Sequence, residues 1–485
     1  MARSAERRER FLRRTKIVCT IGPASASRRT LERLARAGMD VVRLNFSYGT
    51  REEHAGVIAT VRAVADKLGR HIGVLQDLSG PKLRVGELPG GSLELAPGSE
   101  VILSAARRVS PPRVPLPVPR LPRALEPGQR LLLADGRIEL KVIATSEDEV
   151  RCRVTVGGVL KSRQGVNAPD AALPLRTVTA KDLADLRFGL EHQVDWVAMS
   201  FVREASDLQP LRRAMRGASQ PPGLIAKIEK HEAVAHLAEI IAAVDGIMVA
   251  RGDLGIEVSL SQVPLLQKQI ISSANRAGRP VITATQMLES MVTNPRPTRA
   301  EVSDVANAVL DGTDAVMLSG ETAVGRYPVE AVEVMADVVE RAETAFDFEA
   351  RFAESREWPC DAVADGISEA ACNLARDVGA RAIITPTTSG STARMVSRHR
   401  PQTPIVAVSA NVATLRKLSL VWGVHPLLAP RERSTDELIR TATGRVCQAG
   451  FARAGDRVVV TAGVPPGLGN TNLLKVEVVG RHVKL

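Results

Sequence analysis

Short continuous apolar runs alternate with amphipathic stretches along most of residues 15–345. Apolar residues that recur every three or four positions predict helices, for example over residues 51–68 and 299–310, whereas the short continuous runs predict buried strands. The predicted strands begin at Thr15, Val41, Ile72, Trp196, Gly223, Gly246, Pro280 and Ala315. Eight strands that alternate with helices indicate a (β/α)8 TIM barrel, built from residues 15–84 and 174–345.

The alternation is interrupted by residues 85–173, where strand-like fragments are separated by Pro and Gly turns and helical periodicity is absent. This block predicts a small all-β domain, tethered to the barrel by two crossings and able to swing as a lid. Residues 346–485 return to an α/β pattern, which indicates a C-terminal open-sheet domain that follows a polar linker over 346–361. Residues 1–14 are expected to be a basic, frayed leader.

The chain has a net charge of +11, but its basic residues are dispersed and only 3% of its residues are aromatic. These features do not favour nucleic-acid binding, and a basic field suits a small anionic substrate equally well. No apolar run approaches the roughly 20 residues of a membrane span, and the N-terminus lacks the apolar middle of a secretory signal. Five scattered cysteines without a CxxC motif fit a reducing compartment, so we expect a cytoplasmic protein.

The stretch 223–255 carries the most informative charged residues of the predicted barrel, namely Lys227, Glu229 and Asp253. The carboxyl ends of neighbouring barrel strands converge on one face, so Glu229 and Asp253 can approach each other there. Two carboxylates suit a hard divalent cation such as Mg²⁺, and a nearby lysine suits the remaining charge of a phosphate. The alternative interpretation is a buried Lys–Glu pair with an N-capping Asp.

A hydroxyl-rich loop precedes a predicted helix of the C-terminal domain. Hydroxyls and backbone N–H groups at a helix N-terminus are well suited to a phosphate. A helix N-cap rich in Ser and Thr explains the same loop, and on these residues alone it is the favoured interpretation. The loop consists of Thr387, Thr388, Ser389, Gly390, Ser391 and Thr392.

Six motifs follow one another along the predicted barrel. They are Arg43-Leu-Asn-Phe-Ser, Lys227-Ile-Glu229, Ala250-Arg-Gly-Asp-Leu-Gly, Ala284-Thr-Gln-Met-Leu-Glu-Ser-Met, Pro297-Thr-Arg-Ala-Glu and Met317-Leu-Ser-Gly-Glu-Thr. Their order and context resemble those of the pyruvate kinase family, and the inserted lid and the C-terminal domain match as well. The resemblance implies a homotetramer that transfers the phosphoryl group of phosphoenolpyruvate to ADP, giving pyruvate and ATP.

Two other classes of protein compete with this interpretation. Barrel lyases or mutases that bind phosphoenolpyruvate or pyruvate also use Mg²⁺ held by a Glu and an Asp, but they need neither the lid nor the third domain. A non-catalytic phosphate sensor would be favoured by loss of Lys227 or Glu229, and both residues are present.

The resemblance implies roles for individual residues at the phosphoryl group. Glu229 and Asp253 would hold Mg²⁺, which Mn²⁺ could replace, while Lys227 and Arg43 would meet the transferring phosphoryl group. Lys227 is the first choice for the essential cation, because phosphoryl transfer depends on positioning and charge neutralisation.

The substrate carboxylate would lie against backbone N–H groups near Gly252 and Asp253 and against the hydroxyl of Thr298. Thr298 is also expected in the relay that protonates the enolate. Because the pKa of an alcohol is too high for a lone acid, a water chain is the favoured donor.

On the nucleotide side, the resemblance implies contacts from Pro23, Asn45, Tyr48 and Arg84, with the lid closing Asp135 and the loop 165–167 over the cleft. Two residues depart from the family pattern. Gln164 stands where a lysine is frequent, which puts one cationic contact in doubt, and Tyr48 stands where a histidine is frequent.

The monovalent-cation site is the most informative departure. Potassium-dependent members are similar at Asn45, Ser47 and Asp77, but they have a threonine in place of Leu78 and a glutamate in place of Lys82. A lysine ammonium could supply the charge otherwise provided by K⁺, so we predict an enzyme that does not require potassium. In the alternative, Lys82 is a solvated loop residue and a cation still binds Asp77.

The resemblance also reverses the preference for the loop 387–392. In the family context this loop is expected to bind a phosphorylated effector, a sugar phosphate or a nucleotide, with the loop 463–469 closing over it. The identity of the effector cannot be read from the sequence.

Overall fold

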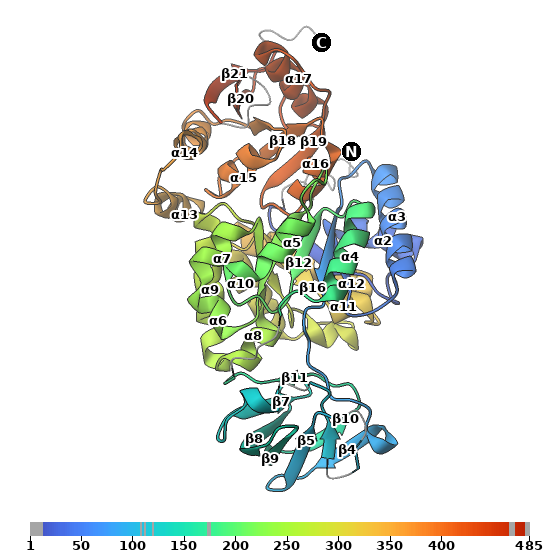
Figure 1. Cartoon of the computed structure of the whole chain (residues 1–485). Coiled ribbons are helices and arrows are strands. Elements are labelled where there is room, and N and C mark those ends of the chain that lie inside the picture. The colour runs from blue at the N-terminus through green and yellow to red at the C-terminus, as the bar shows by residue number, and fades with distance from the viewer. Residues whose placement is uncertain are drawn as a thin grey trace.

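The computed structural model describes residues 13–106, 109–110, 113–118, 121–171, 176–464 and 471–480. These residues form three parts, which Figure 1 shows stacked along one direction with the barrel in the middle. The β-rich insertion lies at one end of the barrel and the C-terminal domain at the other. The residues from 1 to 12 of the expected leader lie outside the described part of the chain.

The central part is a closed barrel of eight parallel strands in the order β1-β16-β15-β14-β13-β12-β3-β2. This confirms the predicted (β/α)8 barrel. Each strand is almost entirely buried, because its inner face packs within the barrel and its outer face packs against helices. The strands are β1 (Lys16–Thr20), β2 (Val41–Asn45), β3 (Gly73–Leu78), β12 (Trp196–Met199), β13 (Gly223–Ile228), β14 (Gly246–Ala250), β15 (Val281–Ala284) and β16 (Ala315–Leu318).

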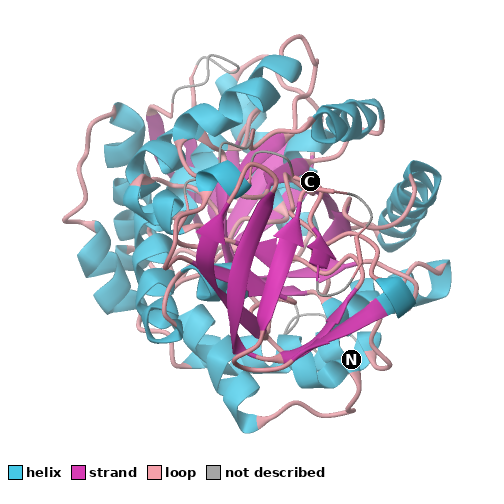
Figure 2. Cartoon of the chain, turned by 60° about the horizontal axis from the view of Figure 1, so that its bottom comes forward, coloured by secondary structure: helices cyan, strands magenta, loops and turns pink. Residues whose placement is uncertain are grey.

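Helices surround the barrel strands, and Figure 2 shows helices around the outside of the molecule with strands towards its centre. Threonine N-caps with capping boxes begin three of the helices, at Thr50, Thr179 and Thr298. The helices are α2 (Arg28–Ala37), α3 (Arg51–Leu68), α4 (Ala180–Glu191), α5 (Gln209–Ala214), α6 (His231–Ala235), α7 (Leu237–Ala243), α8 (Arg251–Glu257), α9 (Val263–Arg276), α10 (Arg299–Leu310), α11 (Gly320–Ala323) and α12 (Pro328–Thr344).

Two local expectations for the barrel and linker differ from the structure. The single helix expected after β13 is divided at His236, whose φ of −101° and ψ of 21° lie outside the helical range. The linker 346–361 contains a helix, α13 (Phe348–Ser355), which Asp347 caps by accepting the N–H of Ala350. The polar composition of this segment predicted a linker, whereas the structure has a short capped helix there.

The insertion forms the predicted all-β part. A six-stranded sheet in the order β11-β7-β8-β9-β5-β6 stands beside a two-stranded sheet, β10-β4. The short strands β6, β10 and β11 were not anticipated from the sequence. The strands are β4 (Ser92–Leu95), β5 (Glu100–Ser104), β6 (Arg113–Pro115), β7 (Arg130–Leu133), β8 (Ile138–Thr145), β9 (Glu149–Val156), β10 (Gly158–Lys161) and β11 (Val166–Asn167).

The C-terminal domain is an open sheet of five strands in the order β19-β18-β17-β20-β21, in which only β21 is antiparallel to its neighbour. This agrees with the expected open α/β sheet. Its elements are α14 (Val363–Asp377), β17 (Ile383–Pro386), α15 (Ser391–Ser397), β18 (Ile405–Ser409), α16 (Val412–Leu418), β19 (Val424–Leu428), α17 (Thr435–Gln448), β20 (Arg457–Ala462) and β21 (Leu473–Val478).

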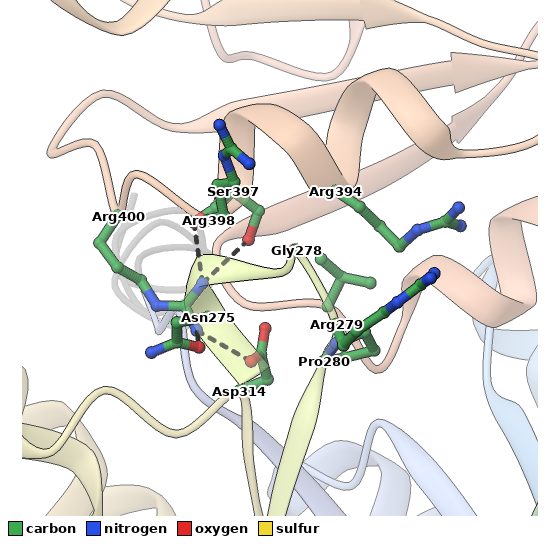
Figure 3. Close-up of a pocket in the computed structure, with 10 residues that line it drawn as sticks. Asn275, Gly278, Arg279, Pro280, Asp314, Arg394, Ser397, Arg398 and Arg400 are labelled. Carbon is green, nitrogen blue, oxygen red and sulfur yellow. Dashed lines mark hydrogen bonds and ion pairs between the residues drawn. The ribbon is translucent and has the colours of Figure 1, made fainter. Parts of the chain in front are cut away.

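Buried polar contacts join the C-terminal domain to the barrel. Arg400 donates to a carboxylate oxygen of Asp314 at 2.8 Å and to Asn275 Oδ1 at 2.6 Å, as the dashed lines of Figure 3 show in part.

At the start of β1, the Arg13 guanidinium lies 2.7 Å from the Asp40 carboxylate, and Arg14 donates its backbone N–H to Glu343. Arg13 and Arg14 are therefore anchored to the barrel, and the expected frayed leader does not extend to residue 14.

Among the described residues, no helix combines the length and the apolar character that crossing a bilayer requires.

Candidate active site

Lys227 lies at the centre of a buried cluster at the carboxyl ends of the barrel strands. Its Nζ is 2.7 Å from Glu229 Oε1 and 3.4 Å from Asp77 Oδ1, and it donates to Ser200 Oγ at 2.8 Å. The nearby carboxylates Asp77 and Glu229 offset the cost of burial and raise the pKa of Lys227 above its ordinary value. Lys227 is therefore a fixed positive charge.

Arg43 brings a second fixed cation to the same carboxylate. From β2, its Nε and Nη2 lie 2.8 and 2.7 Å from Asp77 Oδ2, and its Nη1 donates to Thr20 Oγ1 at 2.9 Å. Asp77 thus separates two cations, and Arg43 and Lys227 together hold its pKa below the ordinary value despite its burial. Asp77 Oδ1 is buried and makes no hydrogen bond.

Glu229 and Asp253 share this environment. Glu229 directly follows β13 and accepts the backbone N–H of Phe201 at 2.8 Å through Oε2. Its burial raises the pKa of Glu229, and the negative charge of Asp253 raises it further. Asp253 lies in the first turn of α8 and is only partly buried. Two neighbouring carboxylates, one of them buried and resisting ionisation, fit a site for a divalent cation.

Two threonines that follow β15 along the chain, Thr285 and Thr298, make different contacts in the structure. Thr285 comes directly after β15, and its Oγ1 accepts the backbone N–H of Gly252 at 2.8 Å. Thr298 instead is the exposed N-cap of α10, where its hydroxyl donates to Glu301 Oε2 at 2.9 Å. The contact with the predicted substrate-binding backbone is therefore made by Thr285, and sequence reasoning did not single it out although it lies in the motif that begins at Ala284.

A strained turn presents Thr285. Thr285 and Gln286 have φ values of 68° and 55°, in a region that residues other than glycine seldom adopt. Arg251 holds the turn in place by donating through Nη2 to the Thr285 carbonyl at 2.8 Å, and its Nη1 lies 2.7 Å from Asp304 Oδ1. Arg251 lies in the sequence motif around Asp253, but the sequence offered no sign of this positioning contact.

The residues expected on the nucleotide side are more dispersed. Asn45 Oδ1 accepts the N–H of Ser47 at 3.0 Å, which closes a local turn. Tyr48 is 67% exposed and Pro23 is exposed in the turn after β1. Arg84 donates to the Arg163 carbonyl at 3.1 Å, at the base of the lid. The structure does not bring these side chains into the Lys227 cluster.

A cavity lies between the lid and the barrel, and Lys82 is among its lining residues. The Lys82 side chain lies beside the lid, with its Cε 3.3 Å from where a Cβ on Gly165 would stand. Asp77, by contrast, is countered by Arg43 and Lys227. Leu78 is completely buried and brings no side-chain oxygen to this region. Gln164 Oε1 accepts the N–H of Lys161, so this side chain is used within the lid.

The hydroxyl-rich loop of the C-terminal domain connects β17 to α15. Thr388 and Ser389 are exposed, whereas Thr392 is buried and shares a hydrogen bond of 2.7 Å with Thr471. The N-cap of α15 is Gly390, which has no side chain to cap the helix. Hydroxyls of the loop nevertheless cap this end of the helix, because Thr387 Oγ1 accepts the N–H of Gly390 at 2.9 Å and Ser389 Oγ accepts that of Ser391 at 3.4 Å. The capping interpretation therefore keeps structural support. Most of the loop 463–469 lies outside the described residues.

Comparison with protein families places both large domains. Residues 12–332 match the family model described as "Pyruvate kinase, barrel domain". Residues 365–477 match the model "Pyruvate kinase, alpha/beta domain". Together the two matches span most of the chain, including the barrel and the C-terminal domain.

Two curated relatives and one solved structure are similar to this chain along nearly its whole length. A pyruvate kinase of Geobacillus stearothermophilus is 46% identical over 472 residues, which are 96% of this chain and 80% of that protein. One of Bacillus licheniformis is 46% identical, over 97% of this chain and 81% of its own length. The crystal structure of a pyruvate kinase from Cryptosporidium parvum superposes with a TM-score of 0.92 at 36% identity, covering 97% of each chain. This chain is a member of the pyruvate kinase family and, with its charged cluster at the barrel mouth, a phosphotransferase of that type.

Proposed function

We propose that the chain transfers the phosphoryl group of phosphoenolpyruvate to ADP at the cluster around Lys227. The observation that carries the proposal is the pair of fixed cations, Arg43 and Lys227, on either side of Asp77 and next to Glu229. In the reaction the bond between phosphorus and the enol oxygen breaks, and a bond to a terminal oxygen of ADP forms. The enolate that remains takes up a proton on carbon to give pyruvate.

The charged residues supply most of what such a transfer requires. The transferring phosphoryl group carries negative charge throughout, so catalysis depends on neutralisation and in-line positioning. Lys227 and Arg43 meet the phosphoryl oxygens, since their positive charges are already oriented by Asp77 and Ser200. Glu229 and Asp253 would hold Mg²⁺, or Mn²⁺ in its place. The cation would supply further neutralisation of the negative charge of the transferring group.

The substrate carboxylate lies against the first turn of α8. The first N–H groups of a helix have no partner within it, and they favour an anion. Because Thr285 already takes the N–H of Gly252, the N–H of Asp253 is the one proposed to meet the carboxylate. Thr285 is tied to this turn through Gly252 and donates its own hydroxyl hydrogen to the Ala284 carbonyl at 2.6 Å, so its role is to position the turn rather than to bind the carboxylate. A water chain delivers the proton to the enolate, as expected from the high pKa of an alcohol.

The remaining assignments belong to the same proposal. ADP binds between the lid and the barrel with contacts from Pro23, Asn45, Tyr48 and Arg84, and lid closure excludes water. The reaction does not require K⁺, because cationic side chains already counter Asp77. A phosphorylated effector binds the loop 387–392, and the chain acts as a homotetramer with isologous interfaces.

A coupled assay of pyruvate formation from phosphoenolpyruvate and ADP tests the proposal directly. Wild type should form pyruvate only when both substrates and Mg²⁺ are present. Lys227→Met should lose about three orders of magnitude or more in kcat, as expected when a cation at the transferring group is removed. Pyruvate formation without ADP, or an unimpaired Lys227→Met variant, would refute the assignment.

A further inference from the structure

A second group of potential metal ligands lies beside the active site but does not belong to it. His231 Nδ1 is 3.2 Å from Glu232 Oε2 and 3.5 Å from Glu257 Oε2. One ligand atom from each of the three residues lies within 4.8 Å of the others. His231 and Glu232 begin α6, and Glu257 ends α8, so the group joins two elements that are separate in sequence.

The carboxylates of this group are only partly satisfied. Glu257 is 7% exposed, and among the described residues its buried Oε1 has neither a hydrogen bond nor an ion pair, whereas Oε2 pairs with Lys230. Glu232 Oε2 is buried with only His231 Nδ1 near it, at 3.2 Å, and both glutamates line the cavity between the lid and the barrel. A buried carboxylate without hydrogen bonds is costly unless a cation compensates it.

Lys230 supplies part of that compensation in the structure. Its Nζ lies 2.8 Å from Glu257 Oε2, and its side chain is 15% exposed. One ammonium group faces two carboxylates here, so Lys230 alone does not balance the charge of Glu232 and Glu257. The flexible lysine stem can swing into the cavity and leave the carboxylate free.

We propose that His231, Glu232 and Glu257 form a binding site for a transition-metal dication of the Zn²⁺ class, separate from the Mg²⁺ site. Metal bonds of about 2.0–2.1 Å in a tetrahedron place neighbouring donors about 3.3 Å apart, close to the two distances from His231 Nδ1. An imidazole with two carboxylates suits Zn²⁺, whereas Mg²⁺ takes oxygen ligands. A water completes the coordination, and the half-exposed His231 side chain provides the entry path.

The site has a structural consequence for the neighbouring reaction centre. Glu232 follows Glu229 by three positions, and Glu257 follows Asp253 by four positions on α8. A metal bound by Glu232 and Glu257 therefore links α8, which carries Asp253, to the start of α6, which begins two residues after Glu229. It also replaces the Lys230 ion pair with stronger bonds.

Equilibrium dialysis with Zn²⁺, in excess Mg²⁺ to fill the Glu229 and Asp253 site, tests the proposal. All variants carry Cys360→Ser, because Cys360 is an exposed free thiol that could bind zinc by itself. The parent should bind one Zn²⁺ per chain. His231→Gln and Glu257→Gln should each bind it at least about tenfold more weakly, since metal sites are that sensitive even to loss of outer partners.

Two further variants distinguish a metal site from a purely structural ion pair. Lys230→Met removes the competing ammonium, so it should bind Zn²⁺ at least about tenfold more tightly than the parent. His236→Gln, which removes an exposed imidazole outside the group, should bind Zn²⁺ as the parent does. Thermal unfolding without Zn²⁺ identifies any variant that fails to fold. Unchanged affinity in folded His231→Gln and Lys230→Met proteins would overturn the proposal.

Discussion

The hydroxyl oxygen of Thr285 accepts the backbone N–H of Gly252 at 2.8 Å, which ties the end of β15 to the first turn of α8. Asp253 is the next residue along that turn, so this hydrogen bond fixes the backbone that carries one of the two candidate Mg²⁺ ligands. Because Thr285 itself has a positive φ and is held by Arg251, the arrangement is rigid and strained.

Replacement of Thr285 should therefore damage catalysis more than folding. Thr285→Val keeps the shape of the side chain but leaves the Gly252 N–H without its partner. A displacement of the α8 turn by a fraction of an ångström should lower kcat by about 100-fold, the cost typical of misplaced reacting groups. Steady-state kinetics with phosphoenolpyruvate and ADP give the measurement.

Thr298 provides the matched control. Thr298→Ala removes the capping box of α10 and should lower the stability of that helix by about 1 kcal/mol, visible as a lower thermal midpoint. The turnover of this variant should stay close to that of wild type. Should Thr298→Ala lose turnover while Thr285→Val retains it, the original assignment of Thr298 to catalysis would be restored.

The sequence predicted the barrel with high fidelity, because each strand is a buried apolar run with clear boundaries. It also predicted Lys227 and Glu229 together at the mouth of the barrel, with Arg43 at the same phosphoryl group. It assigned Asp77 to a monovalent-cation site instead, whereas the structure has Asp77 between Arg43 and Lys227. The contact that Thr285 makes could not be predicted from the sequence, for a physical reason. Its contact with Gly252 depends on a left-handed turn, and the sequence of a turn without glycine does not reveal such a conformation.

Other parts of the fold depended on tertiary contacts that leave a weak sequence signal. The strand β11 is only two residues long, and it is defined by its pairing with β7 at the edge of the six-stranded sheet. The second metal-ligand group unites residues of α6 and α8, which come together only through the barrel. Spacing along the chain could not have indicated either relationship.

Potassium should not stimulate the enzyme. Leu78 contributes no oxygen, and the Asp77 carboxylate is already flanked by Arg43 and Lys227. Assays with Mg²⁺ in tetramethylammonium buffer should give full activity, and KCl at matched ionic strength should not increase it. The double variant Leu78→Thr, Lys82→Glu should become dependent on K⁺, because it restores the residues of potassium-dependent members.

The contrary outcome has a clear structural interpretation. Asp77 Oδ1 makes no hydrogen bond with the described residues and has Lys227 Nζ at 3.4 Å, so K⁺ would have to compete with that ammonium group for it. A large increase in the rate of the wild-type enzyme on addition of KCl, but not of tetramethylammonium chloride, would show that a monovalent cation binds there. Lys82 would then be a solvated residue of the lid base.

A phosphorylated effector should act through the loop between β17 and α15. The exposed hydroxyls of Thr388 and Ser389 lie just before the N-terminus of α15, which favours a phosphate. Sugar phosphates or AMP should shift the phosphoenolpyruvate saturation curve of wild type. Ser389→Glu should abolish the shift through charge repulsion, whereas Ser27→Glu at the N-cap of α2 should retain it. An unchanged curve for wild type with every such compound would exclude an effector role.

Lys16 should make the free energy of unfolding depend on pH, and replacing Lys16 should remove that contribution. Lys16 donates to the Val424 carbonyl at 2.9 Å across the contact between the barrel and the C-terminal domain, and burial lowers its pKa to about 8. The unfolded chain, with the ordinary pKa of 10.5, holds more protons at a pH between these values. Stability attributable to Lys16 therefore rises with pH in that window, by up to about 1.4 kcal/mol per pH unit.

The variant Lys16→Met isolates this contribution, because every other titrating group is common to both proteins. Thermal midpoints measured at several pH values should show wild type gaining on Lys16→Met as the pH rises above 8. Parallel profiles would mean that Lys16 keeps its ordinary pKa, and hence that water reaches its ammonium group. The domain contact at Val424 would then be open to solvent rather than closed as the structure has it.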